Sequence, residues 1–372
     1  EAFTIYENSD GLALPLEGVT TDNIGWCPSN VNICRVNRSF TIDEIQQKLQ
    51  TNDWNVWQEG NQLIFAFHGH APEVFVTGGF YLELAPVNNS DYWVATLQIA
   101  NLDVAVMSHI FGIRQNNDAQ LIPASYGVWR GEYAPEAPEF TPEFKGYYGN
   151  ELLYSPELDE LRMLSYYLPP NYAFHQTYPV LYMTDGQALG AFAQVIEPLI
   201  AKRIIPPMIL VGVFSPDDSS TRNRRAEEYI LGLNDEAYLA HEQFFTETVR
   251  RWAELRLHAS TDPAERAIMG FSNGAVFAGN TGVRKPDLYG HVIMFSQSDI
   301  PLIHLRSQIH ARYYLAAGTL EPQMHSLAQR FYLTLLLMEV DSRFRQRVSG
   351  HDFVFWQEEL VHALQWMFTG DH

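Results

Sequence analysis

Ser272 lies in a pattern that is typical of a catalytic nucleophile. The segment Gly270-Phe-Ser-Asn-Gly274 fits G-x-S-x-G, with a short apolar run before it and another after it. In a strand–turn–helix, this pattern forms a tight turn that exposes the serine hydroxyl, while the glycines keep Cβ atoms out of the crowded turn. The N-terminus of the following helix favours developing negative charge there. The pattern predicts nucleophilic chemistry at Ser272, against the alternative of an ordinary strand–turn–helix junction.

A serine nucleophile needs a base that accepts its proton and an acid that orients the base. In a chain with this turn, the acid and then the histidine follow the serine. His351 comes after the last strand-like segment, in a loop opened by a glycine, where the base is expected. Glu321 and Asp299 each follow a predicted strand, at the sheet edge where catalytic groups collect. We expect Glu321 to be the acid because it lies one strand later, and Asp299 is the alternative.

The negative charge that develops on an attacked carbonyl needs two N–H donors. The backbone N–H of Asn273, directly after the serine, would be one of them. The other would come from Gly186 or Gln187, in a loop that follows an early buried strand. Asp185 precedes this loop, where its common role is that of a turn residue.

The remaining chain predicts two domains that position these residues. The chain has 372 residues, more than one typical domain, and 46% of them are hydrophobic, enough for a large core. Residues 39–50 are expected to form a helix capped by Thr41 or Ser39. The short strands after this helix predict a β-sandwich. Residues 1–125 are therefore expected to form an Ig-like β-sandwich domain with a short leading helix. Residues 126–149 are rich in proline and glycine and predict a linker.

Residues 150–372 predict the catalytic domain. Apolar strand-like segments alternate there with helical ones, which indicates a mostly parallel sheet with helices on both faces, the α/β class that a G-x-S-x-G turn suits. The expected strands are residues 162–168, 178–183, 208–214, 267–269, 291–295 and 312–316, and the expected helices are residues 187–200, 238–256, 323–338 and 356–368.

Composition excludes some partners. There are 24 Lys and Arg against 44 Asp and Glu, so the net charge is −20. This charge argues against nucleic acids and anionic membrane surfaces, because both require basic residues. No apolar run is long enough for a transmembrane helix, and the first residues lack the features of a signal peptide, so we expect a cytoplasmic protein.

Few other residues suggest binding sites. Cys27 and Cys34 are the only cysteines, and they could be bridged or reduced. His68-Gly-His70 and Asp217-Asp218 are expected to form turns rather than to bind metal, so no metal or organic cofactor is expected.

Four segments, in order along the chain, give a family resemblance. They are residues 179–187, 270–274, 317–322 and 350–356. Together they resemble the putative-esterase family of α/β-hydrolases, whose best-known members, the enterochelin esterases, hydrolyse ester bonds of catecholate siderophores. The resemblance implies an α/β-hydrolase fold, with Ser272 as nucleophile, His351 as base, Glu321 as acid and oxyanion donors near Gly186 and Asn273. The N-terminal part is similar, more loosely, to the sandwich domain that precedes the catalytic domain in those enzymes.

We therefore expect a serine esterase that acts on a small-molecule ester through an acyl-enzyme, and a homodimer is open. Asp185, Arg222 and Arg225 are candidates for substrate binding. The alternative is that Arg222, Arg224 and Arg225 pair with Glu227 and Glu228 and brace a loop. Two other functions are open: an acyltransferase that uses the same site, and a non-catalytic ligand-binding protein on the same scaffold.

Overall fold

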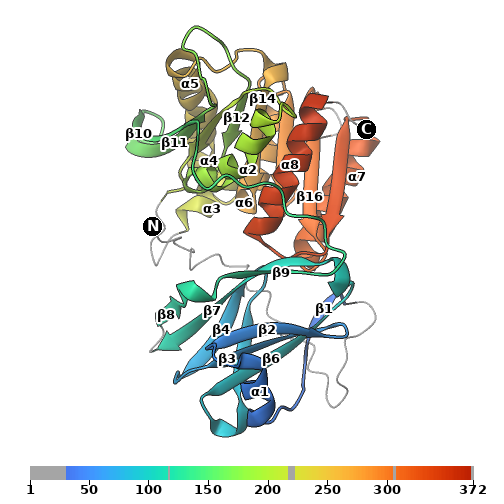
Figure 1. The fold of residues 1–372 in the computed structure, drawn as a ribbon. Helices are drawn as coiled ribbons and strands as arrows, with labels where there is room; N and C mark the ends of the chain where they lie inside the picture. The colour runs from blue at the N-terminus through green and yellow to red at the C-terminus, as the bar shows by residue number, and fades with distance from the viewer. Residues whose placement is uncertain (1–30, 116–117, 217–222, 305–306, 370–372) are drawn as a thin grey trace. The chain divides into compact units, whose positions relative to one another are not determined.

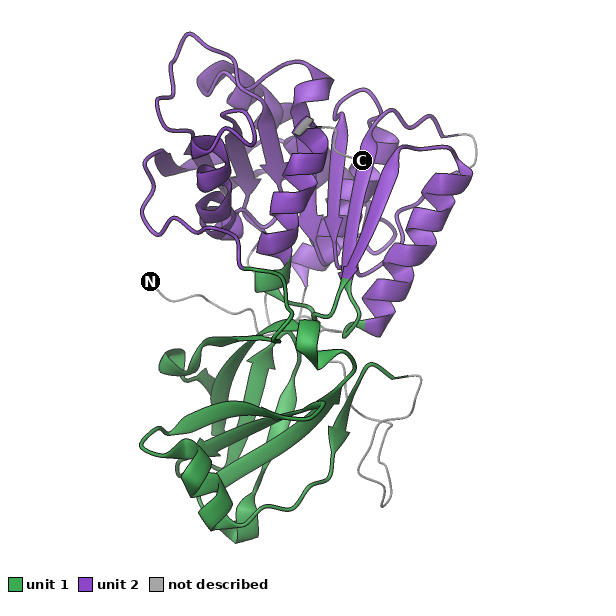
Figure 2. Cartoon of the chain, turned by 45° about the vertical axis from the view of Figure 1, so that its right-hand side comes forward, with its two compact units in different colours: residues 1–136, 318–321, 347–355 green, residues 137–317, 322–346, 356–372 purple. Residues whose placement is uncertain are grey.

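The computed structural model describes residues 31–115, 118–216, 223–304 and 307–369 (Figure 1). The chain divides into two compact units (Figure 2). Unit 1 comprises residues 1–136, 318–321 and 347–355, and unit 2 comprises residues 137–317, 322–346 and 356–372. The division after residue 136 falls inside the expected linker. Two short segments of the expected catalytic domain, residues 318–321 and 347–355, cluster with unit 1 instead.

Unit 1 is built on one nine-stranded sheet in which every described strand pair is antiparallel. The strand order is β2-β3-β6-β5-β4-β7-β8, with β1 beside β6 and β9 beside β7. The strands are β1 (Ile33–Val36), β2 (Trp54–Glu59), β3 (Gln62–His68), β4 (Glu73–Gly78), β5 (Leu82–Pro86), β6 (Tyr92–Ile99), β7 (Val106–Gln115), β8 (Asp118–Leu121) and β9 (Gly127–Arg130). Three 3-10 turns, η1 (Val87–Asn89), η2 (Leu102–Val104) and η3 (Pro123–Ser125), connect them.

The expected Ig-like sandwich of separate sheets is an antiparallel half-barrel in the structure. The strand β5 causes the difference, because it pairs with β4 through Leu82 and Leu84 and with β6 through Ala85 and Pro86. The sheet therefore curls around a single core that contains Phe65, among others. An alternating pattern of apolar residues shows which side chains are buried but not which strands pair, so the sequence did not reveal this connection.

The helix α1 (Ile42–Leu49) covers part of this sheet. Its N-cap is Thr41, whose hydroxyl accepts a hydrogen bond from the N–H of Glu44, while the Glu44 carboxylate accepts one from the N–H of Thr41. This reciprocal capping box satisfies two N–H groups at the helix start. Ile45 and Leu49 face the sheet and pack on Ile64.

Unit 2 contains an eight-stranded sheet in the order β10-β11-β13-β12-β14-β15-β16-β17. Its strands are β10 (Tyr147–Ser155), β11 (Glu160–Leu168), β12 (Val180–Met183), β13 (Ile209–Val213), β14 (Arg266–Phe271), β15 (His291–Phe295), β16 (Arg312–Gly318) and β17 (Ser342–Arg347). The pairs β10–β11 and β11–β13 are antiparallel, whereas the pairs from β13 through β12, β14 and β15 to β16 are parallel. The sheet is therefore mixed rather than mostly parallel, because an apolar run indicates burial but not strand direction.

Helices cover both faces of this sheet, as expected. The helices α2 (Leu189–Ala201) and α8 (Phe353–Thr369) lie on the near face in Figure 1, where the rings of Phe192 and Trp356 contact that of Phe271. The core of the other face is formed with α3 (Arg224–Tyr229), α4 (Asp235–Gln243), the π-helix η5 (Phe244–Val249), α5 (Arg250–Arg256), α6 (Asn273–Arg284) and α7 (Pro322–Leu337). The 3-10 turns η4 (Gly186–Ala188) and η6 (Pro263–Glu265) complete the unit.

Candidate active site

Ser272 forms a sharp turn between β14 and α6. Its backbone angles are φ 56° and ψ −128°, a conformation that non-glycine residues rarely adopt and that nucleophile turns of this kind use. The Ser272 N–H donates to the carbonyl of Phe295 at 2.9 Å. A Cβ atom on Gly270 would lie 2.0 Å from the carbonyl oxygen of Gly274, so only glycine allows the strand and the helix to approach this closely. The predicted strand–turn–helix is therefore present at Ser272.

The loop after β12 lies against the start of α6. Asp185 has a left-handed backbone, and η4 begins at the next residue, Gly186. A Cβ atom on Gly274 would lie 2.2 Å from Thr184 Oγ1 and 2.9 Å from Asp185 Oδ2, which shows how closely the two segments pack. The structure thus brings the loop of Gly186 beside the turn that contains Asn273, as two oxyanion donors require.

The side chains around the two candidate donor segments are held by neighbours. Gln187 donates through Nε2 to Ser215 Oγ at 2.9 Å, while its Oε1 accepts from the N–H of Ser215 at 3.3 Å. Asn273 Oδ1 accepts from Ser298 Oγ at 2.6 Å. Because both side chains are engaged, the groups that suit oxyanion binding are the backbone N–H groups.

Asp185 and Arg225, two of the candidates for substrate binding, pair with each other. Arg225 donates through Nε to Asp185 Oδ1 at 2.6 Å and through a terminal nitrogen to Oδ2 at 2.9 Å. The Tyr229 hydroxyl, one turn later on α3, accepts from the N–H of Asp185 at 3.2 Å. The helix α3 therefore holds the residue that precedes Gly186. Arg222, the third candidate, lies outside the described residues.

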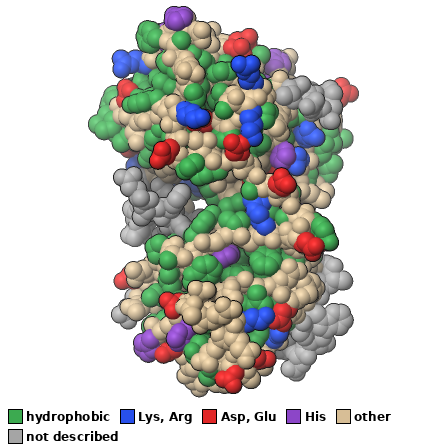
Figure 3. Space-filling view, viewed as in Figure 1, with side chains coloured by type: hydrophobic (Ala, Val, Ile, Leu, Met, Phe, Trp, Pro, Cys, Tyr) green, Lys and Arg blue, Asp and Glu red, His purple; other side chains and the backbone are tan. Residues whose placement is uncertain are grey.

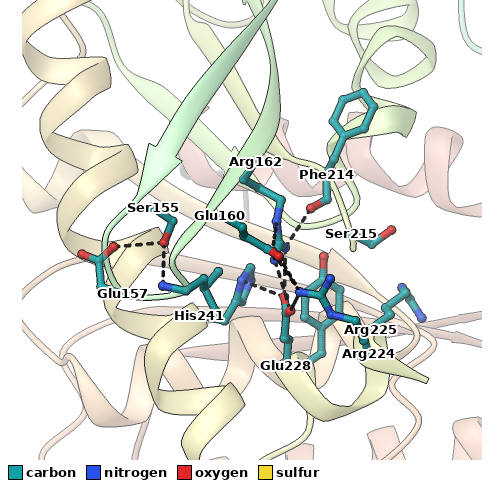
Figure 4. Close-up of polar contacts among 12 residues, drawn as sticks. Ser155, Glu157, Glu160, Arg162, Phe214, Ser215, Arg224, Arg225, Glu228 and His241 are labelled. Carbon is teal, nitrogen blue, oxygen red and sulfur yellow. Dashed lines mark hydrogen bonds and ion pairs between the residues drawn. The ribbon is translucent and has the colours of Figure 1, made fainter. Parts of the chain in front are cut away.

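A buried charge cluster, which the sequence analysis missed, anchors α3 to β11 (Figure 4). The guanidinium group of Arg162 donates to both carboxylate oxygens of Glu228, at 2.9 and 3.1 Å, and also pairs with Glu160. Arg224 pairs with Glu160 and with Glu228, so the alternative of a glutamate partner holds for Arg224. The available signal was the charged pair Glu160 and Arg162 at the start of β11, which has mostly apolar residues after it.

His241 lies beside this cluster without a positive charge of its own. Its Nδ1 is 3.3 Å from Glu228 Oε2, and its side chain is fully buried. Burial, and next the nearby charge of Arg162, lower the pKa of His241 well below its ordinary value. Burial also opposes the charge of Arg162, but Glu228 and Glu160 outweigh it and raise the pKa of that guanidinium. The cluster therefore has a structural role.

His351 and Glu321 form a hydrogen-bonded pair within unit 1. Nδ1 of His351 is 2.8 Å from Glu321 Oε2, and the N–H of Gly318 donates to Glu321 Oε1 at 2.7 Å. The Glu321 side chain is 1% exposed and that of His351 is 11% exposed. Because a carboxylate only accepts, Nδ1 carries the proton in the neutral imidazole, and Nε2 has the basic lone pair. Asp299, the alternative acid, is exposed and accepts from the N–H of Ile300.

The three candidates follow strands of one sheet. Ser272 follows β14, Glu321 follows β16 and His351 follows β17, in the order that the G-x-S-x-G class requires. The strands β14, β15 and β16 run parallel, so their carboxyl ends lie at the same edge of the sheet. Ser272 belongs to unit 2, whereas Glu321 and His351 belong to unit 1.

Three other histidines contact neighbouring groups, and His68, which was expected to lie in a turn with Gly69 and His70, is instead the last residue of the strand β3. The ring of His68 stacks on Tyr92 with centroids 4.3 Å apart, and Nδ1 of His70 is 3.1 Å from Asp91 Oδ1. His291 is buried, with Nε2 3.1 Å from the carbonyl oxygen of Ala264. Within the described ranges, no group of three or more His, Cys, Asp or Glu side chains could hold a metal ion. Asp217 and Asp218 lie outside those ranges.

Other sequence expectations concern charge, membranes and cysteines. On the face drawn in Figure 3, acidic and basic side chains are interspersed over both units. Of the helices in the described part of the chain, none is both long and apolar enough to cross a membrane. Cys34, buried on β1, is disulfide-bonded, and Cys27 lies outside the described residues.

Comparison with known proteins places these features in a family. Residues 155–367 match the model of a family described as "Putative esterase". YjcH, an uncharacterized protein of Bacillus subtilis (strain 168), is 26% identical over 234 residues, which cover 58% of this chain and 94% of that protein.

Solved esterases share the fold. The enterobactin esterase FES from Shigella flexneri, solved in the presence of enterobactin, has a TM-score of 0.67 at 17% identity and covers 89% of this chain and 98% of its own. The ferric enterobactin esterase from Salmonella typhimurium has a TM-score of 0.65 at 16% identity, with 87% and 99% covered. A ferulic acid esterase from Anaeromyces mucronatus, in complex with ferulic acid, has a TM-score of 0.50 at 16% identity, with 62% and 97% covered.

The likeness to solved structures shows an α/β-hydrolase-like fold preceded by an antiparallel β domain. The family match spans more than half of the chain and includes the residues of the Ser272 turn, the Glu321 loop and the His351 loop. The chain therefore belongs to the putative-esterase family and is a carboxylic ester hydrolase.

Proposed function

We propose that this hydrolase is a serine esterase with Ser272 as nucleophile, His351 as general base and Glu321 as the acid that orients the base. The observation that carries the proposal is the 2.8 Å contact between His351 Nδ1 and Glu321 Oε2. This contact leaves Nε2 as the basic nitrogen of a neutral imidazole, which is the state that a general base needs. The strained turn at Ser272 supports the role of the serine.

Catalysis proceeds through an acyl-enzyme. His351 Nε2 takes the hydroxyl proton as Ser272 Oγ bonds to the ester carbonyl carbon, and the N–H groups of Asn273 and of Gly186 or Gln187 bind the oxyanion. The carbon–oxygen bond to the alcohol then breaks, and His351 gives its proton to the departing oxygen. A water molecule, deprotonated by His351, attacks the acyl-enzyme, and the proton returns to Ser272 as the acid is released.

The substrate class that we propose is an ester of a catecholate siderophore. The enterobactin esterases cover between 86% and 89% of this chain, whereas the ferulic acid esterases cover 61% to 62%. The net charge of −20 gives an anionic substrate no long-range attraction, so recognition would depend on local contacts. A panel of catecholate lactones, feruloyl esters and acetylated sugars tests the class, and a preference for feruloyl or acetyl esters would contradict it.

The catalytic assignment is tested by substitution at the serine. We expect Ser272→Ala to abolish turnover of short p-nitrophenyl esters and labelling by a fluorophosphonate probe. Turnover near that of the wild type would contradict the assignment. A wild-type protein that neither turns over esters nor reacts with the probe would favour the ligand-binding alternative, and ester products with added alcohols would favour the acyltransferase.

The identity of the acid is tested by a matched pair of amide substitutions. Glu321→Gln removes the charge beside His351 and should lower kcat strongly. Asp299→Asn changes an exposed side chain and should leave kcat close to that of the wild type. A larger loss in Asp299→Asn would assign the acid to Asp299 instead.

The cytoplasmic location stays a prediction.

A further inference from the structure

The segments that carry the acid and the base are built into the half-barrel of unit 1. Val106, at the start of β7, donates its N–H to the carbonyl of Val348 at 3.0 Å. Asn32 donates through Nδ2 to the carbonyl of Thr319 at 3.0 Å. Leu320 is 1% exposed and belongs to the hydrophobic core of the half-barrel. Residues 318–321 and 347–355 are thus held by the β domain.

Asp352, the residue after the proposed base, is the strongest of these connections. Its Oδ2 accepts from the N–H of Ser108 at 2.5 Å, and its Oδ1 accepts from the Ser108 hydroxyl at 2.9 Å and from the N–H of Val354 at 3.0 Å. Asp352 is 1% exposed and Ser108 is 6% exposed. Next to it, His351 donates its own N–H to the carbonyl of Gly79 at 3.1 Å. The backbone around the base is therefore held by β7 and by Gly79, the residue that follows β4.

The fit between the base segment and the half-barrel allows little movement. A Cβ atom on Gly350 would lie 1.8 Å from the carbonyl oxygen of Gly79, and one on Gly79 would lie 2.9 Å from Asp352 Oδ2. The backbone at Gly350 therefore lies directly against the backbone at Gly79. A rotation of the base segment would break the hydrogen bonds of a buried carboxylate, which is costly because water cannot replace them.

We propose that Ser108 and Asp352 are positioning residues for His351, so that the β domain sets the direction of the catalytic base. The inference rests on the proposed function, because it needs His351 to be the base. Neither residue touches a reacting atom. Together they fix the backbone directly after His351, and this backbone determines where the imidazole points.

The test compares three substitutions of buried side chains in the same unit. Ser108→Ala removes the hydrogen bond from the Ser108 hydroxyl to Asp352 and keeps the one from the Ser108 N–H. Asp352→Asn disturbs all three hydrogen bonds that the Asp352 carboxylate accepts. Ser125→Ala is the matched control, because Ser125 is fully buried in the same domain and its hydroxyl accepts from the N–H of Phe111 on β7 at 2.8 Å but makes no hydrogen bond to Asp352. Urea unfolding of each variant gives the cost in stability, and steady-state kinetics on a p-nitrophenyl ester gives kcat and KM.

A positioning role predicts a change in kcat that does not follow stability. We expect kcat to fall about tenfold in Ser108→Ala and about a hundredfold in Asp352→Asn, with KM within about twofold, because small misplacements of a catalytic group have effects of this size. Ser125→Ala should lose similar stability to Ser108→Ala and keep its kcat. The inference is overturned if both Ser108→Ala and Asp352→Asn keep their kcat, or if Ser125→Ala loses as much activity. Activity that survives in Ser272→Ala would overturn the proposed function instead.

Discussion

Replacing Arg225 by alanine should release the loop of Gly186 from α3. Arg225 binds both oxygens of Asp185, at 2.6 and 2.9 Å, and the two side chains are 16% and 3% exposed. Alanine removes this cation from a buried carboxylate, a change that costs about 3–5 kcal/mol in comparable buried pairs. The fold should become less stable in proportion, as measured by the midpoint of urea unfolding.

The same substitution should lower activity more than stability explains. Asp185 directly precedes Gly186, so a carboxylate that turns toward water would carry the N–H groups of Gly186 and Gln187 with it. Loss of one oxyanion donor lowers kcat about 100- to 1000-fold. We expect the kcat of Arg225→Ala to fall by nearly this factor at a temperature where the variant is fully folded. Arg225→Lys keeps the positive charge but not the planar guanidinium, so its kcat should lie between that of Arg225→Ala and that of the wild type.

Arg284→Ala provides the matched control. Arg284 binds both oxygens of Glu242, at 2.7 and 3.1 Å, and Glu242 is also 3% exposed, but this pair lies at the end of α6 opposite Ser272. Arg284→Ala should lower stability less than Arg225→Ala does, because the Arg284 side chain is 35% exposed. It should leave kcat unchanged. The reasoning is refuted if Arg225→Ala keeps its kcat, or if the two alanine variants lose activity equally.

Three further substitutions test other features. Gly270→Ala should abolish activity and destabilise the fold, because its Cβ would lie 2.0 Å from the backbone carbonyl oxygen of Gly274. In Gly190→Ala the new Cβ would meet no atom closer than 3.4 Å, so this variant should keep its activity and stability. The measurements are kcat and the thermal unfolding midpoint of each variant. Burial lowers the pKa of His109 from 6.5 to about 4. Between pH 4 and 6.5, His109 therefore binds more protons in the unfolded protein than in the folded one. The free energy of unfolding should fall as the pH drops from 6.5 to 4, and His109 should account for about 3 kcal/mol of this fall. His109→Leu should flatten that dependence in urea titrations at several pH values, and an unchanged slope would contradict the assignment. Thr41→Ala should cost about 1 kcal/mol in urea unfolding through the lost helix cap, without a change in kcat.

Much of unit 2 was predictable because its signals are local. The expected strands at residues 291–295 and 312–316 correspond to β15 and β16, and the expected helix at 187–200 corresponds to η4 and α2. The turn at Ser272 was recognisable from its glycines, since their spacing reflects the crowding between β14 and α6. The expected helix at 238–256 is a run of α4, η5 and α5, whose π-helical middle has no local signature.

Strand pairing was not predictable from local signals. The strand β10 begins at Tyr147, inside the segment that was expected to be a linker, and its antiparallel pairing with β11 makes the sheet mixed. The change of partner within β5 converts the expected sandwich into a half-barrel. In both cases the pairing depends on which strands meet in three dimensions, and the order of apolar residues carries no information about it.

The sequence by itself determined the types and the order of the residues that could perform ester hydrolysis: a serine between close glycines, then a glutamate, then a histidine. These follow from covalent order and from turn sterics, which are local properties. Only the tertiary structure decided that Glu321 rather than Asp299 meets a histidine, that Arg225 binds Asp185, and that Asp352 is held by Ser108 of the β domain. These contacts join residues between 30 and 244 positions apart, and pairs so distant meet only when whole strands and helices pack.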